Sequence, residues 1–316
     1  MSGSRIALTH ASSQLAEAII EVMVESGISP DSVVLLDDPD SAPARLRFGD
    51  TYLTPQDQYA CDYEGLSAVL LLQPDDELQD LLQHAACYVL THVGDGQPAR
   101  FFNAGDALSQ LPEEPGWVRL AGAEISTLAS VLGPLRQLSE IVTVGLVNVR
   151  SASMFGKPAI EELASQTVSL LNSREAQPSA FALPLAFNMI PGVAHADQVS
   201  QLRALLDNPD LRCSIQEIVV AAFHGLAQAV SLEFAGPIST EAARQQLAGY
   251  PGIRISDQPV SPHSHCRDGH DLYIFDLAEE QNHPNRLQFW IIADGIRNGL
   301  VKNYQNTIQV LPNFVV

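Results

Sequence analysis

The first 36 residues of the chain alternate between strand, helix and strand patterns, and this constrains the fold more than any other feature. A short β-rich run at residues 5–9 is followed by Ser12 and Ser13, either of which can cap a helix. The helix carries apolar residues at helical spacing, and Gly27 is placed to end it before a second strand at residues 32–36. Such a βαβ opening predicts a parallel sheet covered by helices.

Further patterns of buried strands continue this sheet along the first part of the chain. They lie at residues 68–72, 88–91 and 117–120, with a helical piece at 77–84. The alternation of strands and helices favours a Rossmann-like α/β domain.

From about residue 139 the strand patterns become longer and are separated by longer intervals. A mixed sheet with one face covered by helices fits this part better than more βαβ units. We therefore predict two domains: a Rossmann-like domain of nucleotide-binding type formed by residues 1–125 with 295–316, and an α+β domain formed by residues 126–294. The strand patterns of the second domain lie at 141–149, 214–223, 230–234, 272–277 and 287–292, and its helical patterns at 158–171, 198–206 and 240–247.

Composition and charge exclude several classes of function. The chain has 316 residues, is 46% hydrophobic and carries a net charge of −20, which is typical of a folded acidic protein. Phosphate contacts need clustered Lys and Arg, and only 17 are spread over the sequence, so we expect no nucleic-acid binding. No window approaches 18 uninterrupted apolar residues. We expect a cytoplasmic protein without membrane contact, in which the four cysteines are reduced thiols.

The turn after the first strand departs from a dinucleotide fingerprint. That fingerprint needs glycines so that the backbone can approach a pyrophosphate at the helix N-terminus, but this turn carries His10, Ser13 and Ala16. Asp37 and Asp38 end the second strand, where a carboxylate could hold the ribose of NAD and would repel the 2′-phosphate of NADP. We expect no cofactor, with NAD more compatible than NADP. The alternative interpretation of the two aspartates is a solvated turn.

A second strand-to-helix turn lies at residues 121–127, after the predicted strand 117–120. A cysteine at such a turn would be activated, because the helix N-terminus favours the thiolate. The sequence places Ile125 there, followed by Ser126 and Thr127. Isoleucine has no nucleophilic atom, so the chain lacks the residue type that this turn would suit for covalent catalysis.

Several segments of the second domain resemble the aspartate-semialdehyde dehydrogenase family in order and spacing. The most specific is the run Phe289 to Gly299, with Asn303 and Gln305 beyond it. The resemblance covers nearly the whole chain and implies a nucleotide-binding domain with a dimerisation domain. The other resembling segments are Gly156 to Leu163, Ala186 to Pro191, Val230 to Phe234 and Gly236 to Ser239.

The resemblance also identifies the positions at which the family carries its catalytic and substrate-binding side chains. The family forms a thioester on a cysteine, and Ile125 takes its place; Leu226 takes the place of the catalytic histidine. Val219 stands for a substrate-binding arginine, and Arg150 stands for a glutamine. These departures fall on one active site and most run from reactive to inert side chains, which indicates a non-catalytic paralogue.

We therefore expect a homologue that has lost catalysis and acts by binding a protein partner, a paralogue or a metabolite. The alternative is a diverged NAD-dependent oxidoreductase acting on an aldehyde or acyl phosphate in amino-acid biosynthesis. Separately, Ser126 could act as a nucleophile with His224 as its base, if His224 lies on an extended strand two residues before Leu226. The simpler interpretation makes Ser126 the helix cap.

A cluster of side chains that suit zinc or copper lies before the strand at 272–277. It could form a metal site, but it matches no zinc motif, and a polar loop is the favoured interpretation. We expect no other metal ligands. The candidate ligands are His263, His265, Cys266 and His270.

We also expect a homodimer through the second domain. The run Ile218 to Phe223 is apolar throughout, which is typical of a strand buried on both faces. A sheet with helices on one face buries such a strand on both faces only if something covers the other face. The resemblance implies that a second subunit covers it.

Overall fold

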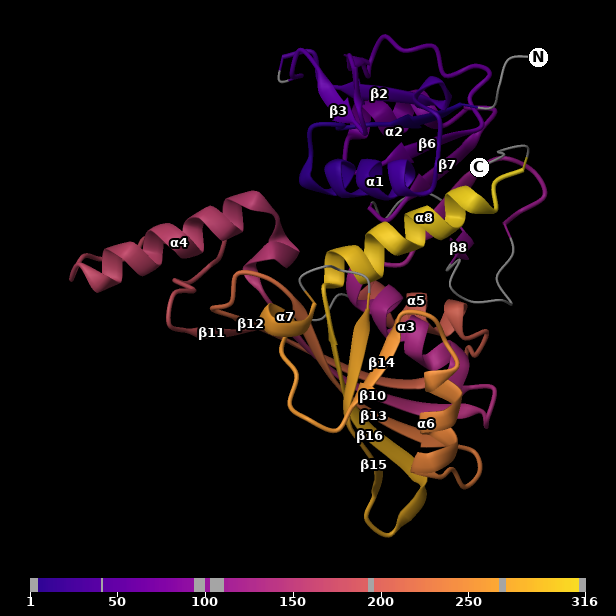
Figure 1. Ribbon diagram of the computed structural model, residues 1–316, viewed down its shortest axis with the longest axis vertical. Coiled ribbons are helices and arrows are strands. Elements are labelled where there is room, and N and C mark those ends of the chain that lie inside the picture. The colour runs from indigo at the N-terminus through magenta and orange to yellow at the C-terminus, as the bar shows by residue number, and fades with distance from the viewer. Residues whose placement is uncertain are drawn as a thin grey trace. The chain divides into compact units, whose positions relative to one another are not determined.

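The computed structural model describes residues 5–40, 42–93, 100–102, 111–192, 196–266 and 271–312. It divides into two compact units (Figure 1). Unit 1 comprises Met1–Gly122 with Leu300–Val316, and unit 2 comprises Ala123–Gly299. Our sequence analysis placed the same junctions at residues 125 and 295, within a few residues of these.

Unit 1 is built on a seven-stranded sheet in which every strand pair is parallel. The predicted α/β class with a Rossmann-like domain is confirmed, because the strand order is that of a doubly wound sheet. In spatial order the strands are β5 (Gln56–Asp57), β2 (Val33–Asp37), β1 (Ile6–Leu8), β6 (Ala68–Leu71), β7 (Tyr88–Thr91), β9 (Trp117–Leu120) and β8 (Arg100–Phe102).

The first helix of unit 1, α1 (Gln14–Glu25), begins and ends at predicted residues. The side chain of Ser13 accepts a hydrogen bond from the Ala16 backbone N–H, and Gly27 follows the helix with a φ of 76°. The remaining elements of this unit are α2 (Asp76–Leu82), α8 (Lys302–Gln309), a 3₁₀ turn at Pro30–Ser32 and the hairpin of β3 (Leu46–Phe48) and β4 (Thr51–Leu53).

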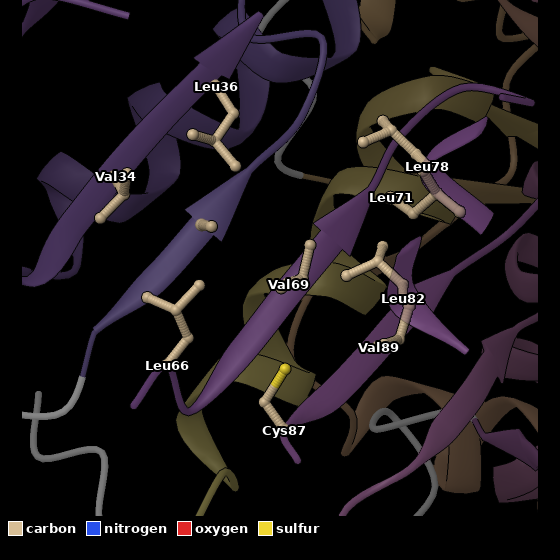
Figure 2. Close-up of a cluster of buried hydrophobic side chains, with 10 residues drawn as sticks. Val34, Leu36, Leu66, Val69, Leu71, Leu78, Leu82, Cys87 and Val89 are labelled. Carbon is tan, nitrogen blue, oxygen red and sulfur yellow. The ribbon is translucent and has the colours of Figure 1, made fainter. Parts of the chain in front are cut away.

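The core of unit 1 contains side chains from four parallel strands and one helix. Figure 2 shows Val34 of β2, Val69 of β6 and Val89 of β7 in one cluster, with Leu78 and Leu82 of α2 near Leu71 and Val89. Every described residue of β1, β2, β6 and β7 is buried. The sheet is therefore covered on both faces, which explains why these strands are apolar runs without alternation.

Unit 2 is built on a second seven-stranded sheet, which mixes parallel and antiparallel pairs. This confirms the predicted α+β domain with a mixed sheet. In spatial order the strands are β11 (Met189–Gly192), β12 (Arg212–Val220), β10 (Ile141–Arg150), β13 (Leu226–Phe234), β16 (His283–Ala293), β15 (Leu272–Glu280) and β14 (Ile253–Ser256).

Helices pack on one face of this sheet and leave alternate strand residues on the other. In β10, Val144 and Leu146 are buried, whereas Gly145 and Val147, which alternate with them, are partly accessible. Figure 1 shows α3, α5 and α6 along one side of the strands, while α4 projects away from them. The helices are α3 (Ala123–Leu135), α4 (Lys157–Leu171), α5 (Ala196–Leu205), α6 (Thr240–Ala248) and the single turn α7 (Pro262–His265), with a 3₁₀ turn at Ala152–Phe155.

Several predicted strand limits in unit 2 are wrong; β15 extends to Glu280 and β16 begins at His283, beyond the predicted runs 272–277 and 287–292. Strand β12 ends at Val220, so Ala221 to Phe223 are not buried strand residues, and the Phe223 side chain is 43% exposed. Strand β13 begins at Leu226, four residues before its predicted start. Small residues such as Ala227 and Ala229 weaken the apolar pattern of β13, although both pair with β10. Among the described residues, no helix is long and apolar enough to cross a membrane.

The C-terminal helix joins unit 1 through a buried aromatic contact. His92, at the end of β7, has its Nδ1 atom 3.0 Å from the hydroxyl of the fully buried Tyr304 in α8, and the two rings meet edge to face. Burial, with a smaller contribution from the charge of Arg119, lowers the pKa of His92 from 6.5 to about 4. The fold therefore favours the neutral imidazole.

This contact predicts acid-sensitive stability. Between pH 6.5 and 4, His92 is protonated in the unfolded chain but not in the folded chain. The contribution of His92 to the free energy of unfolding is therefore greatest above pH 6.5 and decreases towards pH 4. We expect His92→Gln to remove about 2 kcal/mol of this pH dependence in denaturant titrations. His84→Gln, at an exposed position, is the control. Identical pH dependence in wild type and His92→Gln would contradict the assignment.

Candidate functional site

Three of the positions that the resemblance singles out lie side by side at one end of the unit 2 sheet. Arg150, the last residue of β10, pairs with Val219 of β12 on one side and with Leu226 of β13 on the other. Val219 and Leu226 are buried, with 6% and 0% exposure. These positions thus form one site, as the family resemblance implies.

The fourth position, Ile125, lies in the first turn of α3, next to this end of the sheet. Its neighbour Glu124 has a carboxylate oxygen 2.8 Å from Arg150 Nε, and the backbone carbonyl of Glu124 accepts a hydrogen bond of 2.9 Å from Gln228 Nε2 of β13. Ile125 itself is 1% exposed. An aliphatic side chain is therefore buried at the helix start where a reactive thiol would have to be accessible.

Arg150 joins two carboxylates from different elements. Its Nη1 atom donates to Glu217 of β12 at 2.7 Å, while the contact of its Nε atom with Glu124 is an ion pair without hydrogen-bond alignment. The three side chains are only 12%, 10% and 2% exposed, in the order Arg150, Glu124, Glu217. The guanidinium also lies 4.2 Å from the centre of the Phe155 ring. A buried guanidinium that faces two carboxylates has no unmatched positive charge, so it offers little attraction to a further anion.

Neutral amides extend this group into a polar network. Gln198 of α5 donates to the second carboxylate oxygen of Glu217 at 2.7 Å. Gln228 also donates to the side-chain oxygen of Asn148 at 2.8 Å. All four residues are buried. The network ties α3 and α5 to the sheet at the place where the family has its reactive groups.

Glycines of the segment with the most specific resemblance allow this close packing. A Cβ atom at Gly299 would lie 2.4 Å from the carbonyl oxygen of Ala123, the residue that begins α3. A Cβ at Gly295 would lie 3.0 Å from Leu226 Cβ and 2.8 Å from the sulfur of Met154. Both glycines belong to a π-helical stretch, Gly295–Val301. The matched segment thus positions the backbone around the site, a role that does not depend on catalysis.

The alternative pair of Ser126 and His224 is not supported in the form in which we predicted it. Ser126 lies within α3, which begins at Ala123, so it is not the helix cap; it is buried, and its carbonyl accepts a hydrogen bond from Ser130. His224 lies in the exposed turn between β12 and β13. It does not share a strand face with Leu226 because β12 ends at Val220.

The turn at the start of α1 is occupied by contacts within the chain. Asp37 is 2% exposed, and its carboxylate accepts hydrogen bonds from the backbone N–H groups of Ser12 and Asp38 at 2.8 and 3.0 Å. This carboxylate therefore faces the loop backbone. In a dinucleotide site, a phosphate would accept hydrogen bonds from such backbone N–H groups. Asp38 accepts from the Asp40 backbone at 2.8 Å, as expected for a turn.

His10 is held in the same turn from two sides. It adopts a φ of 49°, its backbone N–H donates to Gln58 at 3.2 Å, and its Nε2 atom lies 3.5 Å from the Asp75 carboxylate. The side chains of Ser13 and Ala16 belong to the start of α1, with Ser13 used as the cap. Two carboxylates, Asp37 and Asp75, contact this turn. The turn does not fit a pyrophosphate, since the donors are used and the added charge is repelled.

The candidate metal loop does not assemble in the described part of the chain. His263 and His265 lie in α7, and His265 contacts the backbone of Ser261 and packs against Tyr273. Burial raises the pKa of the Cys266 thiol to about 12, which disfavours the thiolate that binds metals. No cluster of three or more His, Cys, Asp or Glu suited to a metal occurs among the described residues. His270 lies outside them.

Comparison with known proteins gives the family of this chain. The family model described as the semialdehyde dehydrogenase dimerisation domain matches residues 132–298, more than half of the sequence. The chain belongs to the semialdehyde dehydrogenase family. The matched residues include every strand of the unit 2 sheet, so the sheet lies within the region that matches the dimerisation domain.

Relatives of this semialdehyde dehydrogenase family member carry two kinds of name. It is 29% identical to an aspartate-semialdehyde dehydrogenase of Legionella pneumophila, over 61% of this chain and 60% of that protein. It is 24% identical to a USG-1 protein homolog of Azotobacter vinelandii, over 97% of each chain. A second USG-1 protein homolog, from Pseudomonas aeruginosa, is 23% identical over 94% of each chain.

Solved structures confirm the semialdehyde dehydrogenase fold over the whole chain. A probable aspartate-semialdehyde dehydrogenase from Pseudomonas aeruginosa superimposes with a TM-score of 0.87 and 21% identity, covering 99% of this chain and 100% of that one. Aspartate semialdehyde dehydrogenase II of Vibrio cholerae, complexed with ASA, gives a TM-score of 0.86 and 20% identity, covering 97% and 98%. At these identities the likeness establishes the fold.

Sequence reasoning missed most of the polar network, although signals of it exist in the strands. Glu217 lies two residues before the buried Val219, and Gln228 lies two residues after the buried Leu226. Each polar residue therefore shares a strand face with a buried apolar one. A polar side chain on the covered face of a strand needs a buried partner. That partner cannot be identified from spacing alone, because Arg150, which pairs with Glu217, lies far from it in the chain.

The network predicts the effect of restoring the residue that the resemblance expects. Arg150→Gln leaves Glu124 and Glu217 buried without their cation, so we expect the free energy of unfolding to fall by about 3 kcal/mol at neutral pH. The control is Arg244→Gln, since the pair of Arg244 with Asp257 is exposed and is worth less than about 1 kcal/mol. Adding Glu124→Gln and Glu217→Gln to Arg150→Gln should recover part of the loss. A change of under about 1 kcal/mol in Arg150→Gln would contradict the account.

Proposed function

We propose that this chain is a non-catalytic member of the semialdehyde dehydrogenase family that forms a homodimer and acts by binding another protein or a metabolite. The observation that carries the proposal is the buried group of Arg150 with Glu124 and Glu217, in which Glu124 precedes Ile125 and Arg150 pairs in register with Leu226. It places an internal ion pair at the site where the family resemblance requires a nucleophile, a base and a substrate-binding cation.

The chemistry that the resemblance implies has no route through these residues. Formation of a thioester needs a nucleophilic sulfur and a group that transfers a proton, and neither Ile125 nor Leu226 has an ionisable atom. An anionic substrate needs an unmatched cation. Val219 supplies none, and the charge of Arg150 is already balanced by two carboxylates. Loss of these functions together supports a change of role rather than a change of substrate.

The nucleotide-binding domain supports the same conclusion. The carboxylates of Asp37 and Asp75 contact the turn at which a dinucleotide phosphate would have to bind. Hydride transfer to a nicotinamide has no acceptor without such binding. We propose that neither NADP nor NAD is a cofactor of this chain.

The uncovered face of the unit 2 sheet supports homodimer formation. A row of side chains runs across five strands on this face, from Gln216 through Val147, Ala229 and Trp290 to Phe275. Trp290 is 37% exposed and borders a hollow of about 380 Å³ that also contacts Gly145 and Ser231. The indole at the edge of a shallow, largely uncharged surface is typical of a protein interface.

The alternative function is that of a diverged NAD-dependent oxidoreductase. Its support is the doubly wound sheet and the position of Asp37 at the end of β2. The two proposals differ in nucleotide affinity. Micromolar binding of NAD in a calorimetric titration would favour the oxidoreductase, whereas the absence of measurable heat would favour the non-catalytic member.

The proposal predicts that the purified protein does not oxidise aspartate semialdehyde. With phosphate and either NADP or NAD, cofactor reduction should equal a blank without protein; the dehydrogenase of Legionella pneumophila provides the positive control. The double variant Ile125→Cys with Leu226→His should remain inactive, because Val219 and the α1 turn still hold neither substrate nor cofactor. Reduction by the wild-type chain above the blank would refute the proposal.

A further inference from the structure

Unit 2 carries a segment, residues 176–192, that exposes several large apolar side chains close together. Leu183, Phe187 and Met189 are 54%, 69% and 64% exposed. Single exposed apolar residues are ordinary, but three within so short a stretch form a patch. The segment leads from the projecting helix α4 back to β11 at the edge of the sheet (Figure 1).

Buried polar side chains of α4 fix this segment in place. One carboxylate oxygen of Glu162 accepts from the N–H and hydroxyl of Ser179, at 2.9 and 2.6 Å, and from the N–H of Ala180. The side-chain oxygen of Gln166 accepts from the backbone of Leu185 and Ala186, at 2.8 and 3.1 Å. Glu162 and Gln166 are 8% and 2% exposed. The apolar patch is therefore held in a defined shape before it meets anything.

The backbone of Phe187 has an unfavourable conformation. Its φ is 58°, in the left-handed region that bulky residues rarely adopt. The turn is fixed by Asn188, whose N–H donates to the Leu185 carbonyl at 2.9 Å and whose side chain donates to the Pro184 carbonyl at 3.0 Å. The fold thus keeps a phenyl ring in solvent at a conformational cost, which is typical of a recognition site.

The charge distribution indicates what covers the patch. The stretch from residue 176 to 196 is the longest in the sequence without Asp, Glu, Lys or Arg, in a chain with a net charge of −20. Two copies of so acidic a chain repel each other, and the repulsion is smallest where their contact surfaces carry no charge. A basic partner would instead be met by carboxylates. The uncharged patch therefore fits a second copy.

The position of the patch within the sheet supports the same occupant. Met189 begins β11, which pairs with β12 and is the edge strand of the sheet whose uncovered face we assign to the dimer. The whole segment lies within residues 132–298, which match a dimerisation domain. Patch and sheet face are thus continuous through β11 and β12.

We infer that the 176–192 segment docks on a second copy of this chain, with Phe187 as its central contact. The inference rests on the proposed homodimer and extends it from the sheet face to this segment. Since a symmetric dimer contains the contact twice, removal of the ring weakens both copies of it.

The test is the self-association of Phe187 variants of the full-length chain. Sedimentation equilibrium gives the dissociation constant, and exchange of fluorescently labelled subunits gives the dissociation rate. We expect Phe187→Glu to raise the dissociation constant, the dissociation rate or both at least tenfold. Phe187→Gly should weaken the dimer likewise while leaving the melting temperature of the dissociated chain unchanged or higher, because glycine adopts the positive φ without strain. Tyr52→Glu, at a residue of unit 1 that is 61% exposed, is the matched control and should change neither.

The outcomes separate this inference from the proposed homodimer. A wild-type chain that is monomeric at micromolar concentration contradicts the homodimer itself. A wild-type dimer that both Phe187 variants leave unchanged in affinity and exchange rate overturns the inference and leaves the homodimer in place. Weakening by Tyr52→Glu as large as that by Phe187→Glu also overturns it, because the effect would then come from added charge alone.

Discussion

The arrangement of unit 2 depends on one electrostatic requirement: the charge of Arg150 must be matched inside the protein. Its guanidinium joins Glu124 of α3 to Glu217 of β12, and Gln198 completes the hydrogen bonding of Glu217. Removing a charge from water costs several kcal/mol unless partners replace the solvent. Once the partners are present, the end of the sheet and the start of α3 form a closed, packed group. A catalytic site requires the opposite, namely charges that remain available to a substrate.

The same region explains how a family fold can persist without the family's reactive groups. Gly299 allows the backbone of α3 to approach, and Gly295 allows Leu226 and Met154 to pack closely. These are steric requirements of the fold, and they hold whether position 125 carries sulfur or carbon. An aliphatic residue at Ile125 is even favoured, since its side chain is buried. The fold and the chemistry are thus supported by different residues of the same segments.

Much of the fold could be predicted from the sequence because its strongest patterns are local. The limits of β7 and β9 agree with the predicted strands, and Ser13 caps α1 as its side chain suggests. The site was less accessible to sequence reasoning. Glu124 and Glu217 reach Arg150 only through the tertiary fold. The positive φ of Phe187 cannot be inferred from the composition of its segment. The error at His224 had a local cause: a run of small and apolar residues resembles a strand even where the chain turns.

The central claim is that no group at the α3 turn can form a covalent bond with substrate, and mass spectrometry tests it most directly. The protein is incubated with aspartate semialdehyde in the presence and absence of NADP in phosphate-free buffer, quenched with acid, digested at acidic pH and mapped. We predict that the peptide containing Glu124, Ile125 and Ser126 keeps its unmodified mass under both conditions. The corresponding peptide of the Legionella pneumophila dehydrogenase serves as the reactive reference. A substrate adduct on Ser126 or on Glu124 of this chain would contradict the claim.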